Sequence, residues 1–314
     1  MIIKDTATLR KYLSVNGSVD HDNIAPYLRK AERTFLKPAI GSEQLAIFDT
    51  EVTDEIIKEA QELAQEVVAN YAYFLYLPIG AVQITDSGIQ VAENEHAKSA
   101  SDKQFKELQR SFLKSAHEAL DELLAFMEVS ADKFIEWFNS DTHTVYKDLL
   151  VNKTDIFNKY YYIFNSRQTF TSLKPNLQIT EDRFIKASVG KELLEALKEN
   201  QTDENRKEVK KLLQQSIVAF TVMLTVENGM FVLDAKGMHM RFDVLPYEKT
   251  ITNVNLKIND FLLRTKDNKQ VEGEEYLKMA LNVIKENPTK FTEYTEKEQA
   301  DYINITKTKS IISL

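Results

Sequence analysis

The sequence has no cysteine and very little glycine. Its 314 residues include 8 Gly, 6 Pro and no Cys. Without cysteine, a disulfide framework, a thiolate zinc site and a cysteine nucleophile are all excluded. At the usual frequency of about 7%, roughly 22 glycines would be expected. The shortage leaves no G-x-G-x-x-G and no G-x-x-x-x-G-K-[S/T] loop to hold nucleotide phosphates, so no nucleotide cofactor is expected.

A strongly basic stretch and a long apolar run are also missing. The net charge is −8, divided into −10 for residues 1–149 and +2 for residues 150–314. The small Lys/Arg cluster at 206–211 is mixed with acids, which argues against binding nucleic acid through phosphate neutralisation. The longest apolar stretch, 67–82, is shorter than the roughly 20 residues of a bilayer span. Since no signal peptide precedes it, we expect a soluble protein without a membrane partner.

The two halves of the sequence are similar when one is shifted against the other by 149 residues. Identical pairs include Glu32/Glu181, Asp54/Asp203, Gln65/Gln214 and three glycine pairs. Beyond residue 100 the shift becomes 157, with Leu124/Leu281, Lys133/Lys290 and Phe134/Phe291. Such self-similarity predicts a tandem duplication. The predicted parts are a first module at 1–149, a second module at 150–298 with an insertion near 245–270, and a C-terminal arm at 299–314.

Apolar spacing predicts the same elements in each half. Helical periods occur at 5–15, 23–36, 55–77 and 101–127, and again at 155–164, 179–185, 204–225 and 274–285. Thr53 and Thr202 are expected to be the N-caps of the two long central helices. Alternating segments around a glycine, at 82–91 and 231–240, are typical of β-hairpins. The predicted fold class is therefore mainly α (α+β), with three or four helices and one β-hairpin in each copy.

Six of the eight glycines belong to the matched pairs. In a chain with so little glycine, these positions are expected to mark backbone sites where a side chain would not fit. The three sites are a helix C-cap, a break between helix and strand, and a hairpin turn. The residues are Gly41, Gly80, Gly88, Gly190, Gly229 and Gly237.

No arrangement of residues that supports catalysis or metal binding is found. The five histidines form no H-x-H or H-E-x-x-H pattern, and the polar triplet His117, Glu118 and Asp121 lacks the second histidine of a zinc protease. The acidic groups Glu93/Glu95 and Glu272/Glu274/Glu275 are the kind of residues that a hydrolase uses as acid and base. Their alternative interpretation is a solvated surface. We therefore predict no catalytic, cofactor or metal residues.

Two groups of apolar and aromatic residues are candidates for contact with a partner. Tyr160, Tyr161 and Tyr162 are consecutive, and consecutive aromatic residues suit either an interface or a helix packed into the core. The predicted arm contains Ile303, Ile305, Ile311 and Ile312 and has no match in the first half. It suits either a docking arm or a disordered terminus.

The first half resembles the phage head-to-tail connector (adaptor) proteins. The resemblance rests on T-x-x-L-R-K-Y-L at 6–13, on the segment 22–32 with Gly41, and on YLPIGAVQITDSGIQV at 76–91. The same residues also resemble an uncharacterised protein family of Bacteroidetes phages and prophages. The resemblance covers residues 1–140, and it extends to the second half only through the duplication.

The resemblance implies a structural virion protein without catalysis. Connectors of this kind form a closed ring, often twelve-fold, between the portal and a further neck or tail protein. Double-stranded DNA passes through the ring without sequence-specific binding. The implied location is the neck of the virion, after assembly in the host cytoplasm. Two alternatives are kept: a non-catalytic protein–protein adaptor outside a virion ring, and a hydrolase with an unrecognised acidic site.

Overall fold

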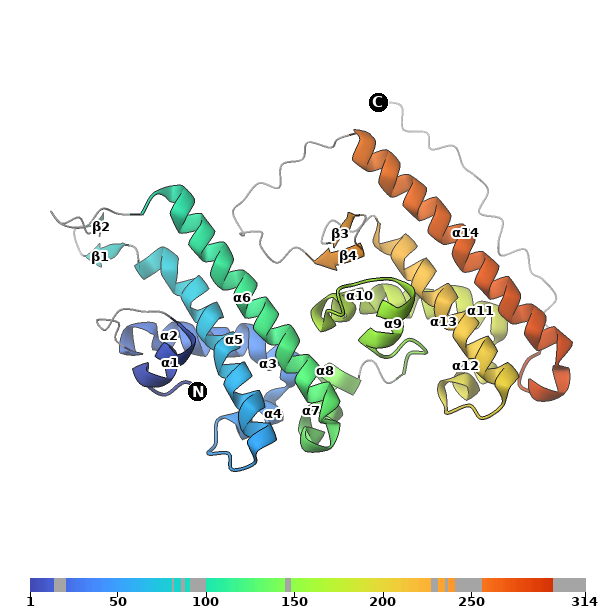
Figure 1. Ribbon diagram of the computed structural model, residues 1–314, viewed down its shortest axis with the longest axis horizontal. Coiled ribbons are helices and arrows are strands. Elements are labelled where there is room, and N and C mark those ends of the chain that lie inside the picture. Colours follow the sequence, from blue (N-terminus) through green and yellow to red (C-terminus); the bar gives the residue numbers. More distant parts are fainter. Residues whose placement is uncertain are drawn as a thin grey trace.

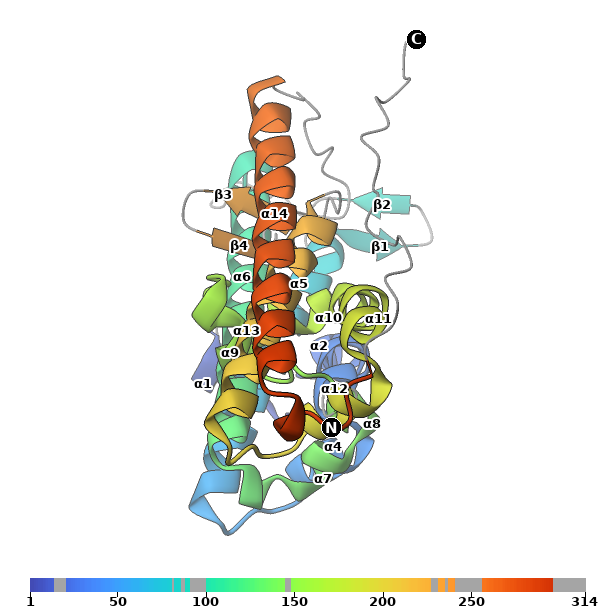
Figure 2. The same cartoon turned by 90° about the vertical axis from the view of Figure 1, so that its right-hand side faces the viewer.

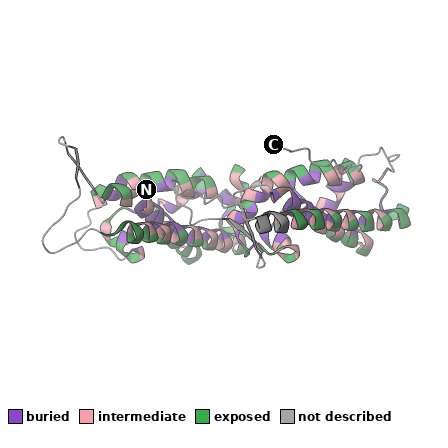
Figure 3. Cartoon of the chain, turned by 90° about the horizontal axis from the view of Figure 1, so that it is seen from above, coloured by how far each residue is buried: buried purple, intermediate pink, exposed green. Residues whose placement is uncertain are grey.

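The computed structural model of the chain is an elongated row of helices (Figure 1). It describes residues 1–13, 21–80, 82–85, 88–90, 100–144, 148–226, 231–234, 237–240 and 256–295. Helices α1 to α8 belong to the first module and α9 to α14 to the second. Seen from above, buried residues lie between the helices along the whole row (Figure 3).

The first module begins with short helices and ends with two long ones and two short ones. A π-helical turn, Glu32–Leu36, continues directly from α2, and a 3-10 turn, Ala131–Lys133, follows α6. The helices are α1 (Thr6–Tyr12), α2 (His21–Ala31), α3 (Lys37–Ile40), α4 (Ser42–Phe48), α5 (Glu55–Gly80), α6 (Asp102–Val129), α7 (Ile135–Asn139) and α8 (Asp141–Thr144).

The second module has the same order of elements. Its π-helical turn, Glu181–Ile185, again continues from a helix with an internal proline, and a 3-10 turn, Pro288–Lys290, follows its last long helix. The helices are α9 (Thr154–Tyr160), α10 (Arg167–Thr180), α11 (Lys186–Val189), α12 (Lys191–Lys198), α13 (Glu204–Thr225) and α14 (Leu256–Glu286). Helix α14 includes part of the predicted insertion and is far longer than the predicted 274–285.

The predicted fold class is wrong in its β part and in its number of helices. The described strands are two short antiparallel pairs, β1 (Gln83–Thr85) with β2 (Gly88–Gln90) and β3 (Phe231–Asp234) with β4 (Gly237–Met240). Each pair is a separate two-stranded unit, and no sheet layer occurs in the described part of the chain. The protein is therefore helical rather than α+β. Each module has more than the predicted three or four helices, because each predicted leading helix is followed by short ones.

Each module has its own hydrophobic core. The first core joins α1, α2, α5, α6 and α7, and the second joins α9, α10, α12, α13 and α14. Stacked aromatic rings occupy matching positions: Phe35 on Tyr71, with centroids 3.8 Å apart, and Phe184 on Phe220, 4.5 Å apart. Such pairs add about 0.5–1.5 kcal/mol to the burial of the rings themselves.

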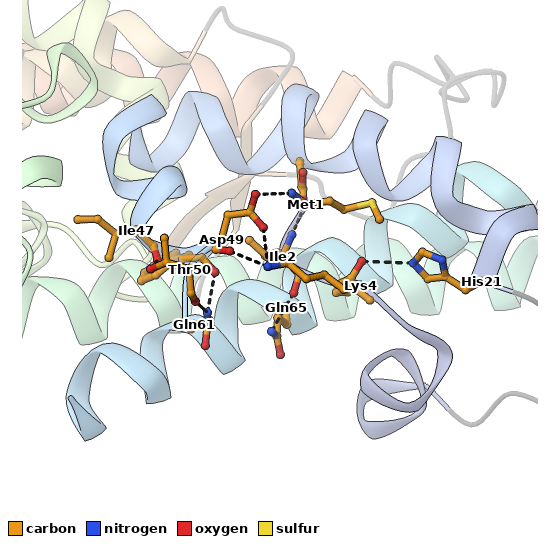
Figure 4. A network of polar contacts seen from close by, with 12 residues as sticks. Met1, Ile2, Lys4, His21, Ile47, Asp49, Thr50, Gln61 and Gln65 are labelled. Atoms are coloured by element: carbon orange, nitrogen blue, oxygen red, sulfur yellow. Dashed lines mark hydrogen bonds and ion pairs between the residues drawn. The ribbon is translucent and has the colours of Figure 1, made fainter. Parts of the chain in front are cut away.

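A buried glutamate and a glutamine hold the first residues of each module against its long central helix. In the first module, Glu32 accepts the N–H of Ile2 at 2.6 Å and Gln65 donates to the carbonyl of Ile2 at 2.9 Å (Figure 4). In the second, Glu181 and Gln214 bond the N–H and carbonyl of Leu150 at 2.7 and 3.1 Å. The matched polar residues thus satisfy buried backbone groups.

The cation beside each buried glutamate differs between the modules. Lys198 lies 2.7 Å from Glu181. Asp49 occupies the matching position in the first module, and the amino group of Met1 lies 2.7 Å from that carboxylate. Burial raises the pKa of Glu32. Contact with the same amino group lowers the pKa of Asp49.

A second repeated contact links the start of the central helix to the turn after the closing helix. Asp54 caps α5 through the N–H groups of Ile56 and Ile57 and also binds Lys133 at 2.6 Å. Asp203 caps α13 in the same way and binds Lys290 at 2.8 Å. The predicted caps, Thr53 and Thr202, are therefore wrong by one residue. A carboxylate also interacts more favourably with the helix dipole than a hydroxyl does.

Gly41 and Gly190 have matching positive φ angles of +82° and +85°. Both end a short helix, α3 or α11, and precede the next one. An L-residue at such φ values is strained by about 1–3 kcal/mol. A Cβ at Gly41 would also lie 3.0 Å from the Cβ of Ser140, whereas a Cβ at Gly190 would meet no atom within 4 Å.

These two glycines give a matched stability test. Gly190→Ala is expected to lower the free energy of unfolding by about 1–2 kcal/mol through backbone strain alone. Gly41→Ala should cost more, because Ser140 must also move. Urea denaturation of both variants would measure the difference. Equal or negligible losses would contradict this account of the two glycines.

Candidate interaction surface at the module junction

The two modules meet where the closing helix α6 of the first packs beside α9 and α10 of the second (Figure 1). Arg167, in the first turn of α10, donates from Nε to Oε2 of Glu128 on α6 at 3.0 Å, and its Nη2 lies 2.9 Å from the same oxygen. The Arg167 side chain is 12% exposed. Charge-assisted hydrogen bonds of this kind are roughly twice as strong as neutral ones.

Gln168 makes the second set of contacts across the junction. Its backbone N–H donates to Oδ1 of Asp121 at 3.0 Å, so a carboxylate of the first module lies at the N-terminus of α10. This placement is favoured by the helix dipole. Its side-chain amide donates to the carbonyl of His117 at 2.7 Å and accepts from Nδ1 of that histidine at 2.7 Å.

Burial shifts two of the titratable groups at the junction. Desolvation lowers the pKa of His117, although the hydrogen bond to Gln168 and the charge of Asp121 act in the opposite direction. Desolvation raises the pKa of Glu128, although Arg167 opposes this shift. The junction therefore favours neutral His117, which bonds Gln168 through one nitrogen and contacts the hydroxyl of Tyr71 with its ring.

A cleft of about 580 Å³ opens beside these contacts. Its walls come from both modules. Leu124, Trp137 and Phe138 form an apolar side, and Thr154 and Arg167 lie opposite. The Thr154 side chain is buried, and its hydroxyl has no hydrogen-bond partner. The volume and the mixed lining suit a side chain of another protein or a small molecule.

The predicted glycines lie at element boundaries. Gly41 and Gly190 are the caps described above, and Gly80 is the last residue of α5. Gly88 and Gly237 begin β2 and β4, where they pair with Thr85 and Asp234. Gly229 lies outside the described residues.

The three predicted interface tyrosines do not form one surface. Tyr160 and Tyr161 are half-buried against the second core, and burial raises the pKa of Tyr160. Tyr162 is 51% exposed, and its ring lies 4.8 Å from that of Phe164. The predicted arm residues, Ile303, Ile305, Ile311 and Ile312, lie outside the described residues.

The acidic groups considered for hydrolysis have ordinary partners where they are described. Glu272 binds Lys269, and Glu274 accepts a hydrogen bond from Gln270. Glu93 and Glu95 lie outside the described residues. Within the described ranges, no group of three or more His, Asp and Glu side chains could hold a metal ion, and no helix is long and apolar enough to cross a membrane.

Sequence reasoning missed Arg167, Gln168 and Glu128 as junction residues. The available signal was the polar series His117, Asp121 and Glu128, with helical spacing on an otherwise apolar closing helix. The sequence gives no indication of which residues of the second module meet this series, because that depends on how the two modules pack.

The chain belongs to DUF6712, a family of unknown function. The family model matches two stretches, residues 37–147 and 179–304, which together make up more than half of the chain. No curated protein and no solved structure matches the chain.

Arg167 provides a direct test of the junction. Arg167→Gln removes the cation while Glu128 stays partly buried, so we expect a loss of about 2–3 kcal/mol in stability. Calorimetry should show the unfolding transitions of the two modules separating. Arg183→Gln, on the π-helical turn, is the matched control. Superimposable unfolding profiles for the two variants would contradict the assigned role of Arg167.

His117 predicts a pH dependence. A histidine with a lowered pKa in the folded state contributes stability above its unfolded value of about 6.5, and this contribution is lost as the pH falls through the folded value. Thermal unfolding between about pH 7.5 and about pH 5 should show the wild type losing more stability than His117→Gln. His21→Asn serves as the control. Parallel losses in wild type and His117→Gln would rule out this contribution.

Proposed function

We propose that the chain is a structural, non-enzymatic subunit of a phage head-to-tail connector. In this proposal, copies of the chain form a closed ring, twelve-fold as in the connectors it resembles, between the portal and a further neck or tail protein. Double-stranded DNA passes through the ring without sequence-specific contacts. The protein acts in the neck of the virion, is assembled in the host cytoplasm, and uses no cofactor.

The observation that supports this proposal best is the unlike character of the two ends of the row. The second module follows the first with the same orientation, so α1 and α2 lie at one end and α14 lies at the other (Figure 1). Association of such ends is heterologous, because one surface meets a different surface of the next copy. Heterologous contacts close into a ring when the rotation between copies allows it.

The charge distribution adds support. The first half carries −10 and the second half +2, so an end-to-end contact places unlike charges together. The acidic first module would also repel the DNA backbone rather than hold it, which suits a passage for a moving genome.

A protein–protein adaptor outside a ring is the second candidate. The cleft at the junction favours it, because a pocket lined by Trp137, Phe138 and Arg167 resembles the anchoring pockets of protein interfaces. An adaptor of this kind needs only one partner, whereas a connector needs copies of itself and a portal.

The location can be tested on particles of the phage or prophage that encodes the chain. Purified particles would be analysed by quantitative mass spectrometry, with the portal protein as the internal standard. We expect the chain in these particles at about one copy per portal subunit, as expected for matched rings. Absence of the chain from complete particles would contradict the connector function.

A second measurement separates the two candidates. The purified chain would be mixed with the portal protein and imaged by negative stain. Rings seated on the portal are the expected result. Free monomers at all concentrations would count against the connector, and a complex of one copy with a single other protein would favour the adaptor.

A further inference from the structure

Helix α6 has two packed sides, whereas α14 has one. Helix α6 packs against α5 within its own module and against α10 of the next module. Helix α14 packs against α13 in the same way, and nothing follows it in the row of described elements (Figure 1). Viewed from that end of the row, α14 lies in front of the other helices (Figure 2).

The outward side of α14 matches the junction side of α6 position by position. At the shift of 157 residues, His117, Asp121, Leu124 and Glu128 correspond to Glu274, Lys278, Leu281 and Lys285. The spacing of these residues places them on one face of a helix. The same helix exposes three large apolar side chains, which is more than an isolated surface helix needs. These are Leu263, Val271 and Met279, each 50–57% exposed.

The opposite end of the row presents the match to the other half of the junction. Thr154 and Thr171 line the cleft on the side of the second module. At the shift of 149 residues, they correspond to Asp5 and Asp22 on α1 and α2. Asp5 caps α1 through the N–H of Thr8. Asp22 is in the first turn of α2 and has a side chain that is 93% exposed.

The charges at these two ends are reversed relative to the junction but remain complementary. Within the chain, acids on α6 face Arg167 and the N-terminus of α10. At the ends, lysines on α14 correspond to those acids, and acids on α1 and α2 lie on the opposite surface. A reversed but complementary pair prevents α14 from competing for α10 of its own chain, because Lys278 and Lys285 would meet Arg167.

From these observations we infer that a second copy of this chain docks its α1–α2 end onto the outward face of α14. The contact repeats the geometry of the internal junction between two chains, so successive modules follow one another without a break. It buries the exposed apolar residues of α14 and places Lys278 and Lys285 beside Asp5 and Asp22. This inference rests on the proposed self-assembly and assigns its interface.

Charge reversal tests the interface. The first variant is Lys278→Glu with Lys285→Glu, and the second is Asp22→Lys. Each should weaken self-association at least about tenfold, because like charges then meet at the contact. The control is Lys191→Glu with Lys211→Glu, which makes the same charge change on exposed residues of α12 and α13. Sedimentation velocity on the full-length chains measures the association.

Mixing the two variants is the decisive step. Each variant repels itself, but the acidic α14 of the first can meet the basic α2 of the second, and the remaining ends keep their native charges. An equimolar mixture should therefore regain wild-type association as alternating copies. Circular dichroism and thermal unfolding of each variant ensure that a loss of association does not come from misfolding.

The outcomes separate the interface from the proposed function. Rings or open head-to-tail oligomers that fail in each variant and return on mixing support the interface, and open oligomers alone would count against a closed ring. Assembly that ignores both charge reversals would overturn the interface while leaving the connector proposal intact. A wild-type chain that stays monomeric at every concentration would also overturn the inference.

Discussion

The structure depends on the fact that each module covers only one side of its closing helix. Helix α6 is held by α5 on one side, and its other side carries the polar series His117, Asp121 and Glu128. That series is satisfied only by the first turn of α10, through Arg167 and Gln168. The second module has the same construction, so its closing helix α14 presents a corresponding face at the end of the row. The need to cover that face leads from the fold to the proposed assembly.

Most of the polar residues shared by the two halves maintain the fold. Glu32 and Gln65 bond the backbone of Ile2, and Asp54 joins a helix start to a lysine after the closing helix. The second module repeats both arrangements. An unpaired buried backbone group costs about 1–3 kcal/mol, which is sufficient reason for such residues to match between the modules without any catalytic role. By contrast, the residues at the junction differ from their matches in the other module, because each set faces a different neighbour.

The sequence predicted the helices and the repeated positions but not the packing between helices. The pairing of Asp54 with Lys133 could not be predicted, because these residues are far apart in the chain and meet only when α6 returns along α5. Gly273 was unmatched in the sequence. In the structure it replaces Ala116 of the first module, and a Cβ there would lie 2.8 Å from the ring of Phe220. The α+β class was wrong because a short alternating segment around a glycine predicts local strand pairing and carries no information on whether a sheet layer forms.

Cross-linking tests the head-to-tail contact most directly, and the absence of native cysteine makes the chain suitable for it. Asp22→Cys and Lys278→Cys would be introduced together, and each alone, and treated with a short bismaleimide. The account predicts a ladder of linked chains for the double variant and only unlinked chains for either single variant. Efficient linking of a single-cysteine variant would show that two identical surfaces meet, and no ladder in the double variant would show that these two ends do not. Either result would contradict head-to-tail assembly through α14.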